Sequence, residues 1–239
     1  MRSTTLTFFC ELDAEALEAL FENDQIIEHL CALNASVSMG IRDFDDRRVA
    51  VVHRLNEAGV PLVAWLLLPK AQGYWFNLDN AQQAVHYYFD FRSWTEEHAL
   101  QWTRIGLDIE PDIREMARLL EGELDVLPTI ARRLLNGQRF RYAHALYAVL
   151  IDQIRADGYP VDGYHLPLIV DERQVGSSLL QRVAGLVDVP SDREVLMLYS
   201  SFMRPWGHAV LWSYAPDAQS VGVGITGGGV DLLDAKQIA

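Results

Sequence analysis

The stretch PLVAWLLL, from Pro61 to Leu68, decides the fold class. Its residues are almost all apolar, and an unbroken apolar run is typical of a parallel β-strand that is buried on both faces. A strand of this kind needs a crossover connection, usually a helix, to reach its next parallel neighbour. The stretch therefore predicts an α/β fold in which helices cover a parallel sheet.

Strand-like runs alternate with helical patterns on both sides of this stretch. We expect seven strands, over residues 5–11, 36–42, 61–68, 104–110, 161–170, 194–200 and 220–226. The segment 202–215 is ambiguous between an eighth strand and a helix. It follows the sixth strand too closely for a parallel crossover, so a helix is at least as well supported as a strand.

Repeated strand-then-helix units have two solutions, a closed barrel or an open doubly wound parallel sheet. Seven or eight strands in 239 residues favour a (β/α)8-type TIM barrel, with the seventh unit irregular or missing. No internal repeat or low-complexity linker interrupts the chain. We therefore expect residues 1–239 to form a single barrel domain.

The composition limits the partners and the location of the protein. The chain has 33 acidic and 20 basic residues, a net charge of −13, and such a surface repels nucleic-acid phosphates and anionic lipids. We expect neither nucleic acid nor membrane as a partner. The N-terminus lacks the pattern of a secretion signal, which predicts a cytoplasmic protein. Cys10 and Cys31 show no metal-binding spacing and are expected to be buried.

The segment RIGLDIEPD carries two carboxylates at the end of the fourth expected strand. Asp108 and Glu110 are two residues apart, so their side chains point to the same face of the strand, toward the barrel interior. Leu107 and Ile109 point to the other face, under the helices. Pro111 cannot donate to the strand ladder, so the strand ends near Glu110. Barrel enzymes keep their active sites at this carboxyl end.

Two carboxylates about 6–7 Å apart along a strand raise each other's pKa, and burial adds to the rise. A carboxylic acid with a raised pKa beside an ionised carboxylate is what cleavage of a glycosidic bond requires. The alternative is a structural one, in which Arg42 or Arg104 forms an ion pair with these carboxylates and only holds the barrel together.

The segment GLDIEP resembles the D-x-E segment on the fourth strand of the chitinase-like and lysozyme-like barrel glycoside hydrolases, families 18 and 25. The resemblance implies a hydrolase that needs no cofactor, with Glu110 as the general acid and Asp108 as the assisting carboxylate. The chain departs from the chitinase pattern upstream, where Thr103 and Gly106 stand in place of two further aspartates.

Other residues near strand ends would converge on the same barrel mouth and are candidates for binding a small-molecule or oligosaccharide substrate. The loop after the third strand has three consecutive aromatic residues, which form either a platform on which a sugar ring stacks or a cluster that packs on the barrel rim. The substrate-binding candidates are Glu11, Arg42, Asp43, Trp65, Lys70, Tyr74, Trp75, Asn77, His165 and Tyr199.

Two other functions are left open by the sequence. In a metal-dependent phosphodiester or sugar-phosphate enzyme, Glu11, Asp108, Glu110 and His165 would bind a divalent metal ion. The glycines 227–229 would then present backbone amides to a phosphate group. In the second alternative the barrel binds carbohydrate without turning it over.

Overall fold

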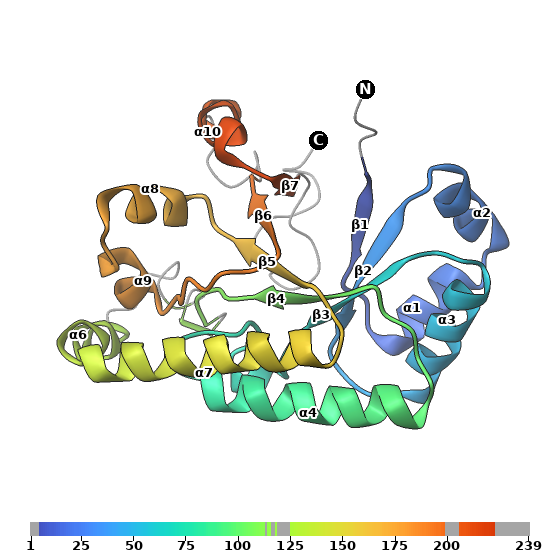
Figure 1. The fold of residues 1–239 in the computed structure, drawn as a ribbon, viewed down its shortest axis with the longest axis horizontal. Coiled ribbons are helices and arrows are strands. Elements are labelled where there is room, and N and C mark those ends of the chain that lie inside the picture. The colour runs from blue at the N-terminus through green and yellow to red at the C-terminus, as the bar shows by residue number, and fades with distance from the viewer. Residues whose placement is uncertain (1–4, 113, 116–117, 119–124, 199–205, 223–239) are drawn as a thin grey trace.

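The computed structural model describes residues 5–112, 114–115, 118, 125–198 and 206–222. Seven strands form one sheet in the order of the chain, and every neighbouring pair is parallel (Figure 1). The strands are β1 (Thr7–Cys10), β2 (Ser36–Ile41), β3 (Leu62–Leu66), β4 (Arg104–Asp108), β5 (Val161–His165), β6 (Arg193–Met197) and β7 (Ser220–Gly222). A doubly wound sheet reverses its strand order at a switch point, whereas a barrel keeps it. The predicted α/β barrel is therefore confirmed, in a form whose described sheet has β1 and β7 at its edges.

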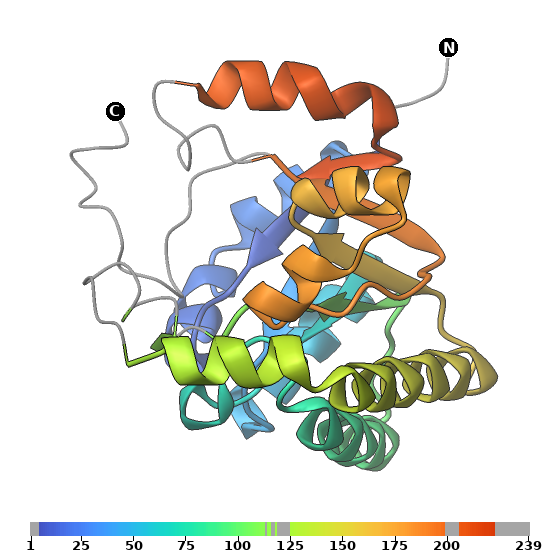
Figure 2. The ribbon, with the colours of Figure 1, turned by 90° about the vertical axis from the view of Figure 1, so that its left-hand side faces the viewer.

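The helices lie mainly on the outside of the curled sheet. They are α1 (Ala14–Phe21), α2 (Asp24–Ala32), α3 (Asp46–Glu57), α4 (Ala81–Glu97), α6 (Leu127–Leu135), α7 (Gly137–Ala156), α8 (Leu168–Val175), α9 (Leu179–Ala184) and α10 (Gly207–Tyr214), with 3-10 turns η1 (Lys70–Gln72) and η2 (Ala215–Asp217). The two longest, α4 and α7, run side by side along one side of the sheet in both views (Figures 1 and 2). Among the described residues, we find no helix with the length and apolar character needed to cross a bilayer.

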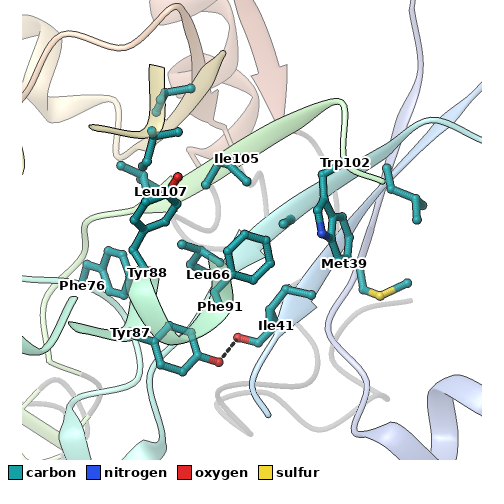
Figure 3. Packing of buried hydrophobic residues seen from close by; sticks show 14 of the residues in the cluster. Met39, Ile41, Leu66, Phe76, Tyr87, Tyr88, Phe91, Trp102, Ile105 and Leu107 are labelled. Atoms are coloured by element: carbon teal, nitrogen blue, oxygen red, sulfur yellow. Dashed lines mark hydrogen bonds between the residues drawn. The ribbon is translucent and has the colours of Figure 1, made fainter. Parts of the chain in front are cut away.

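The strands divide their side chains between two apolar layers. The outward layer packs against the helices, and Figure 3 shows part of it; it includes Met39, Ile41, Leu66, Ile105, Leu107, Tyr88, Phe91 and Trp102. The inward layer is smaller and fills the barrel; it includes Trp65, Leu67, Tyr164, Val195 and Met197. This division follows from the period-two alternation of a strand, which sends successive side chains to opposite faces.

A glycine on β4 makes room for a tyrosine that crosses the barrel interior. The hydroxyl of Tyr164, on β5, lies 2.8 Å from the hydroxyl of Ser38, on β2. A Cβ atom at Gly106 would lie 2.5 Å from the Tyr164 hydroxyl oxygen, closer than such atoms approach. The absence of a side chain at Gly106 therefore lets one ring join two strands that are not neighbours in the sheet.

Two local predictions were wrong, on the fifth strand and on Cys31, and one alternative that the sequence left open is resolved in favour of a helix. The expected strand 161–170 ends at His165, and Pro167 caps helix α8, because an apolar run next to a proline can equally form a short buried helix. The ambiguous segment 202–215 contains helix α10 within its described part. Cys31 is exposed, with its thiol 3.5 Å from the carbonyl oxygen of Ala58, and both cysteines are free.

The substitution Gly106→Ala is expected to destabilise the protein by about 1–3 kcal/mol, because the added methyl group forces Tyr164 away from Ser38. Urea unfolding followed by circular dichroism measures this loss. Gly137→Ala is the matched control, since its methyl group would meet only a side-chain nitrogen of Arg141, at 3.5 Å. Equal stability of the Gly106→Ala variant and the wild type would show that Tyr164 does not occupy this space.

Candidate active site

Three carboxyl groups lie together at the carboxyl end of the strands. Glu11 directly follows β1, Asp108 ends β4, and Glu110 lies two residues further along. The charge of Glu11 raises the pKa of both other groups, which places all three within electrostatic reach of one another. This is the end of the barrel at which enzymes of this fold bind their substrates.

The loop between β3 and α4 turns back over this mouth and contacts Glu11. The Tyr74 hydroxyl donates a hydrogen bond to Oε1 of Glu11. Gly73 and Tyr74 have φ angles of 107° and 67°, and this left-handed turn redirects the chain. A positive φ is costly for a residue with a side chain, so the surrounding contacts must hold Tyr74 in place.

The same loop extends β4 and fixes the backbone of Glu110. The Phe76 N–H donates to the carbonyl oxygen of Asp108 at 3.0 Å, and the Glu110 N–H donates to the carbonyl oxygen of Phe76 at 2.9 Å. These two bonds form a short parallel bridge beyond the end of the strand. Glu110 therefore sits on an ordered backbone that continues the strand.

Asp108 is buried in the barrel interior, with 2% of its surface exposed. Burial, followed by the charges of Glu110 and Glu11, raises the pKa of Asp108 well above its usual range. The indole of Trp65 faces this carboxyl and lowers the pKa of Asp108, which offsets part of the rise caused by burial. Within the described residues, however, neither Trp65 Nε1 nor Asp108 Oδ1 forms a well-aligned hydrogen bond. Two buried polar atoms are thus left unsatisfied in the interior.

Glu110, two residues further along the chain, is partly exposed. Burial and the charge of Glu11 raise the pKa of Glu110 to about 7. Burial also raises the pKa of Glu11, against the opposing effects of the Tyr74 hydrogen bond and of two cations, Arg42 and Lys70. Glu110 can therefore both accept and donate a proton near neutral pH, which is the condition for acid and base catalysis.

The two cations flank the Tyr74 ring. The guanidinium carbon of Arg42, which follows β2, lies 5.8 Å from the ring centroid, and the ammonium nitrogen of Lys70 lies 6.0 Å from it. Arg42 also donates a hydrogen bond of 3.3 Å to the backbone carbonyl of Glu11. Both positive groups therefore border the carboxyl cluster.

Six predicted substrate-binding residues lie around or beside Asp108 and Glu110. Trp65 is buried in the interior next to Asp108, and Trp75 packs edge-on against Tyr74 with the ring centroids 5.5 Å apart. The residues brought together are Glu11, Arg42, Trp65, Lys70, Tyr74 and Trp75.

The other four predicted residues lie elsewhere or cannot be placed. Asp43 forms an ion pair with the buried Arg48 at 3.0 Å. Asn77 is buried in its loop, where its side-chain oxygen accepts the backbone N–H groups of residues 79 and 80. His165 points out of the barrel, on the face opposite Tyr164, and lies 4.0 Å from Glu194. Tyr199 lies outside the described residues.

The predicted metal-binding set does not assemble. His165 lies on the outer face of the sheet, whereas Glu11, Asp108 and Glu110 are at the mouth. In the part of the chain that the structure describes, we find no group of three or more His, Cys, Asp or Glu side chains arranged to hold a metal ion. The predicted phosphate-binding glycines 227–229 lie outside the described residues.

One residue that supports the site was missed in the sequence. Arg133, on α6, is buried and forms ion pairs of 2.5 Å with Asp79 and 2.7 Å with Glu115. Asp79 belongs to the loop that carries Tyr74, so the ion pair anchors the far end of this loop. An arginine in the apolar stretch LPTIARRLL was the only available signal.

Comparison with known proteins yields similarity to solved structures alone. No family model and no curated protein matches the chain. A xylose isomerase domain protein from Planctomyces limnophilus is 12% identical, with a TM-score of 0.45 over 90% of this chain and 72% of that chain. A D-allulose 3-epimerase from Methylomonas sp. is also 12% identical, with a TM-score of 0.44 over 95% of this chain and 77% of that chain.

The resemblance to glycoside hydrolase families 18 and 25 was wrong, and so was the hydrolase function drawn from it. The similar solved structures are an isomerase domain protein and an epimerase, and no glycoside hydrolase family model matches. The physical reason is that a carboxylate pair at a barrel strand end serves many chemistries, so GLDIEP alone does not define a family. Of the two interpretations of the aromatic run after β3, packing on the barrel applies to Tyr74 and Phe76, which are both buried.

The raised pKa of Glu110 predicts a specific pH dependence of stability. A group whose pKa is higher in the folded than in the unfolded protein stabilises the fold below its unfolded pKa, and this contribution is lost as pH rises through about 7. Glu110→Gln should therefore be more stable than the wild type at pH 8, by about 1–2 kcal/mol after allowance for partial exposure. The difference should vanish near pH 4.

Urea unfolding at several pH values measures this effect. Glu97→Gln, which removes an exposed carboxyl from α4, is the matched control for the general loss of one negative charge. If the difference in unfolding free energy between the wild type and the Glu110→Gln variant is the same at pH 8 as at pH 4, Glu110 ionises in the folded protein without a penalty.

Proposed function

We propose that this protein is an enzyme that moves a proton at a carbon next to a carbonyl group, and so isomerises or epimerises a small hydroxylated compound such as a sugar. The observation that carries the proposal is the position of Glu110, a partly exposed carboxyl with a pKa of about 7 at the mouth of a barrel. A group whose pKa lies near the operating pH can both accept and return a proton.

Asp108 has the properties of an oxygen-binding group for this reaction. Burial raises its pKa and so favours the neutral form, and a buried neutral carboxylic acid can donate a hydrogen bond to a negative oxygen. Oδ1 of Asp108 and Nε1 of Trp65 both lack a well-aligned hydrogen bond within the described residues, and buried polar atoms rarely stay so. A substrate oxygen between them would satisfy both and stabilise the enolate formed when Glu110 removes the proton.

Glu11 is the second proton carrier in this scheme. The Tyr74 hydroxyl orients the carboxyl of Glu11, and burial raises the pKa of Glu11. Two carboxyl groups that both exchange protons allow the proton to be removed by one and delivered by the other.

The names of the similar solved structures belong to those proteins, and the support for this proposal comes from the carboxyl groups. The barrel fold adds only that the mouth is the expected place for a small substrate. Binding without turnover would leave Glu110 without a catalytic role and is distinguished from the proposed reaction by the following experiment.

The proposed reaction is tested by solvent deuterium exchange. The protein is incubated in D2O with a panel of aldoses, ketoses and their acidic derivatives, and proton NMR follows the C–H signal next to the carbonyl carbon. A carboxyl base exchanges its proton with solvent, so this signal should be lost, with or without a new sugar as product. Exchange should be faster at pH 8 than at pH 6, as Glu110 ionises.

The Glu110→Gln variant should slow the exchange by about 100-fold or more, the usual effect of losing a general base. The control variant Glu97→Gln should retain the wild-type rate. A Glu110→Gln variant with the wild-type rate would contradict the assigned role, and bound sugars that never exchange would contradict the proposed reaction.

A further inference from the structure

Most arginines of the described residues are engaged in ion pairs, and this makes the exceptions informative. The ion pairs include buried ones, such as Arg48 with Asp43 and Arg133 with Glu115. Within the same residues, the cations without an ion pair inside 4.0 Å are Arg42, Lys70, Arg132, Arg141 and Arg182. Arg42 and Lys70 are the two that border the candidate active site.

Arg42 and Lys70 form no ion pair with the described residues although carboxyl groups are close by. Both lower the pKa of Glu11, so both act on it electrostatically. The Glu11 carboxyl nevertheless takes its hydrogen bond from the neutral hydroxyl of Tyr74. The phenol thus satisfies the carboxylate, and no carboxylate among the described residues forms an ion pair with Arg42 or Lys70.

The charge at the mouth also differs from that of the whole molecule. The chain has a net charge of −13, which by itself repels an anionic ligand. At the mouth, however, burial favours the neutral form of Asp108, and Glu110 is only partly ionised near neutral pH. The positive charges of Arg42 and Lys70 are then opposed mainly by the negative charge of Glu11. The rim can therefore accept an anion.

We propose that the substrate of this site carries an anionic group, a carboxylate or a phosphate, which Arg42 and Lys70 bind at the rim beside Tyr74. A guanidinium group can bind two oxygens of such an anion at once, and an ammonium group adds a compact point charge. Binding at this rim holds one end of the substrate and directs its other end toward Asp108 and Glu110. The substrate class rests on the proposed function, whereas anion binding at the rim can be measured without turnover.

Isothermal titration calorimetry with three probes tests the anion site: D-glucuronate, D-glucose 6-phosphate and D-glucose. The wild type should bind at least one acidic probe about tenfold or more tightly than glucose, the usual effect of a charge-assisted hydrogen bond. Preference for glucuronate or for glucose 6-phosphate identifies the anion as a carboxylate or a phosphate. Raising the salt concentration should weaken the binding of the acidic probe and leave the binding of glucose unaffected.

Arg42→Gln and Lys70→Gln should each lower the affinity for the acidic probe by about tenfold, because each removes one positive charge from the rim. Arg42→Lys keeps the charge and should recover part of the affinity. Arg141→Gln is the matched control, since Arg141 likewise forms no ion pair with the described residues but lies on α7; this variant should bind like the wild type. Urea unfolding of each variant confirms that the fold is retained.

Two results would overturn the anion site: acidic probes that bind no better than glucose, or an equal loss of affinity in Arg141→Gln and in the rim variants. These results are separate from those of the exchange experiment. Tight binding of an acidic probe without C–H exchange would refute the proposed reaction and leave the anion site standing. C–H exchange of neutral sugars, with no tighter binding of the acidic probes, would refute the anion site and leave the proposed reaction standing.

Discussion

The hydroxyl of Tyr74 donates a hydrogen bond to Glu11 and so joins the loop after β3 to the end of β1. The rest of the site depends on this contact. It holds the loop over the barrel mouth, where the next residues pair with the backbone of Glu110. It also gives the partly buried carboxyl of Glu11 a neutral partner, and Arg42 and Lys70 form no ion pair with the residues that the structure describes. The loop is held at its other end by the ion pair of Asp79 with Arg133, so both ends are fixed.

Much of the fold and the centre of the site were predictable from local sequence patterns. Apolar runs such as 61–68 identified the strands, and their number identified a barrel. The alternation in LDIE correctly placed Asp108 in the barrel interior, with Leu107 and Ile109 packed under the helices. These predictions succeeded because burial and strand alternation act over a few residues and are visible in the sequence.

Features set by contacts distant in sequence were not predictable. In the run VDGYHLPLIV, either Tyr164 or His165 could point inward, and the choice depends on the space that Gly106 leaves on the next strand. The aromatic run after β3 left an exposed platform and packing on the rim equally open; Tyr74 turns inward through a left-handed backbone, and Phe76 packs on α7 through Tyr147. The glycoside hydrolase resemblance failed for a related reason: a strand-end carboxylate pair specifies a place in the barrel and leaves the reaction open.

The central claim is that Glu110 titrates near neutral pH because it shares a partly buried mouth with Asp108 and Glu11. Carbon-13 NMR of the side-chain carboxyl carbons in protein labelled at glutamate, recorded from pH 3 to pH 9, measures this most directly, and the Glu110→Gln variant assigns the signal. We predict one glutamate signal that is absent in the variant and titrates with a pKa of about 7. A Glu110 signal that titrates in the ordinary glutamate range, near 4.3, would contradict the account.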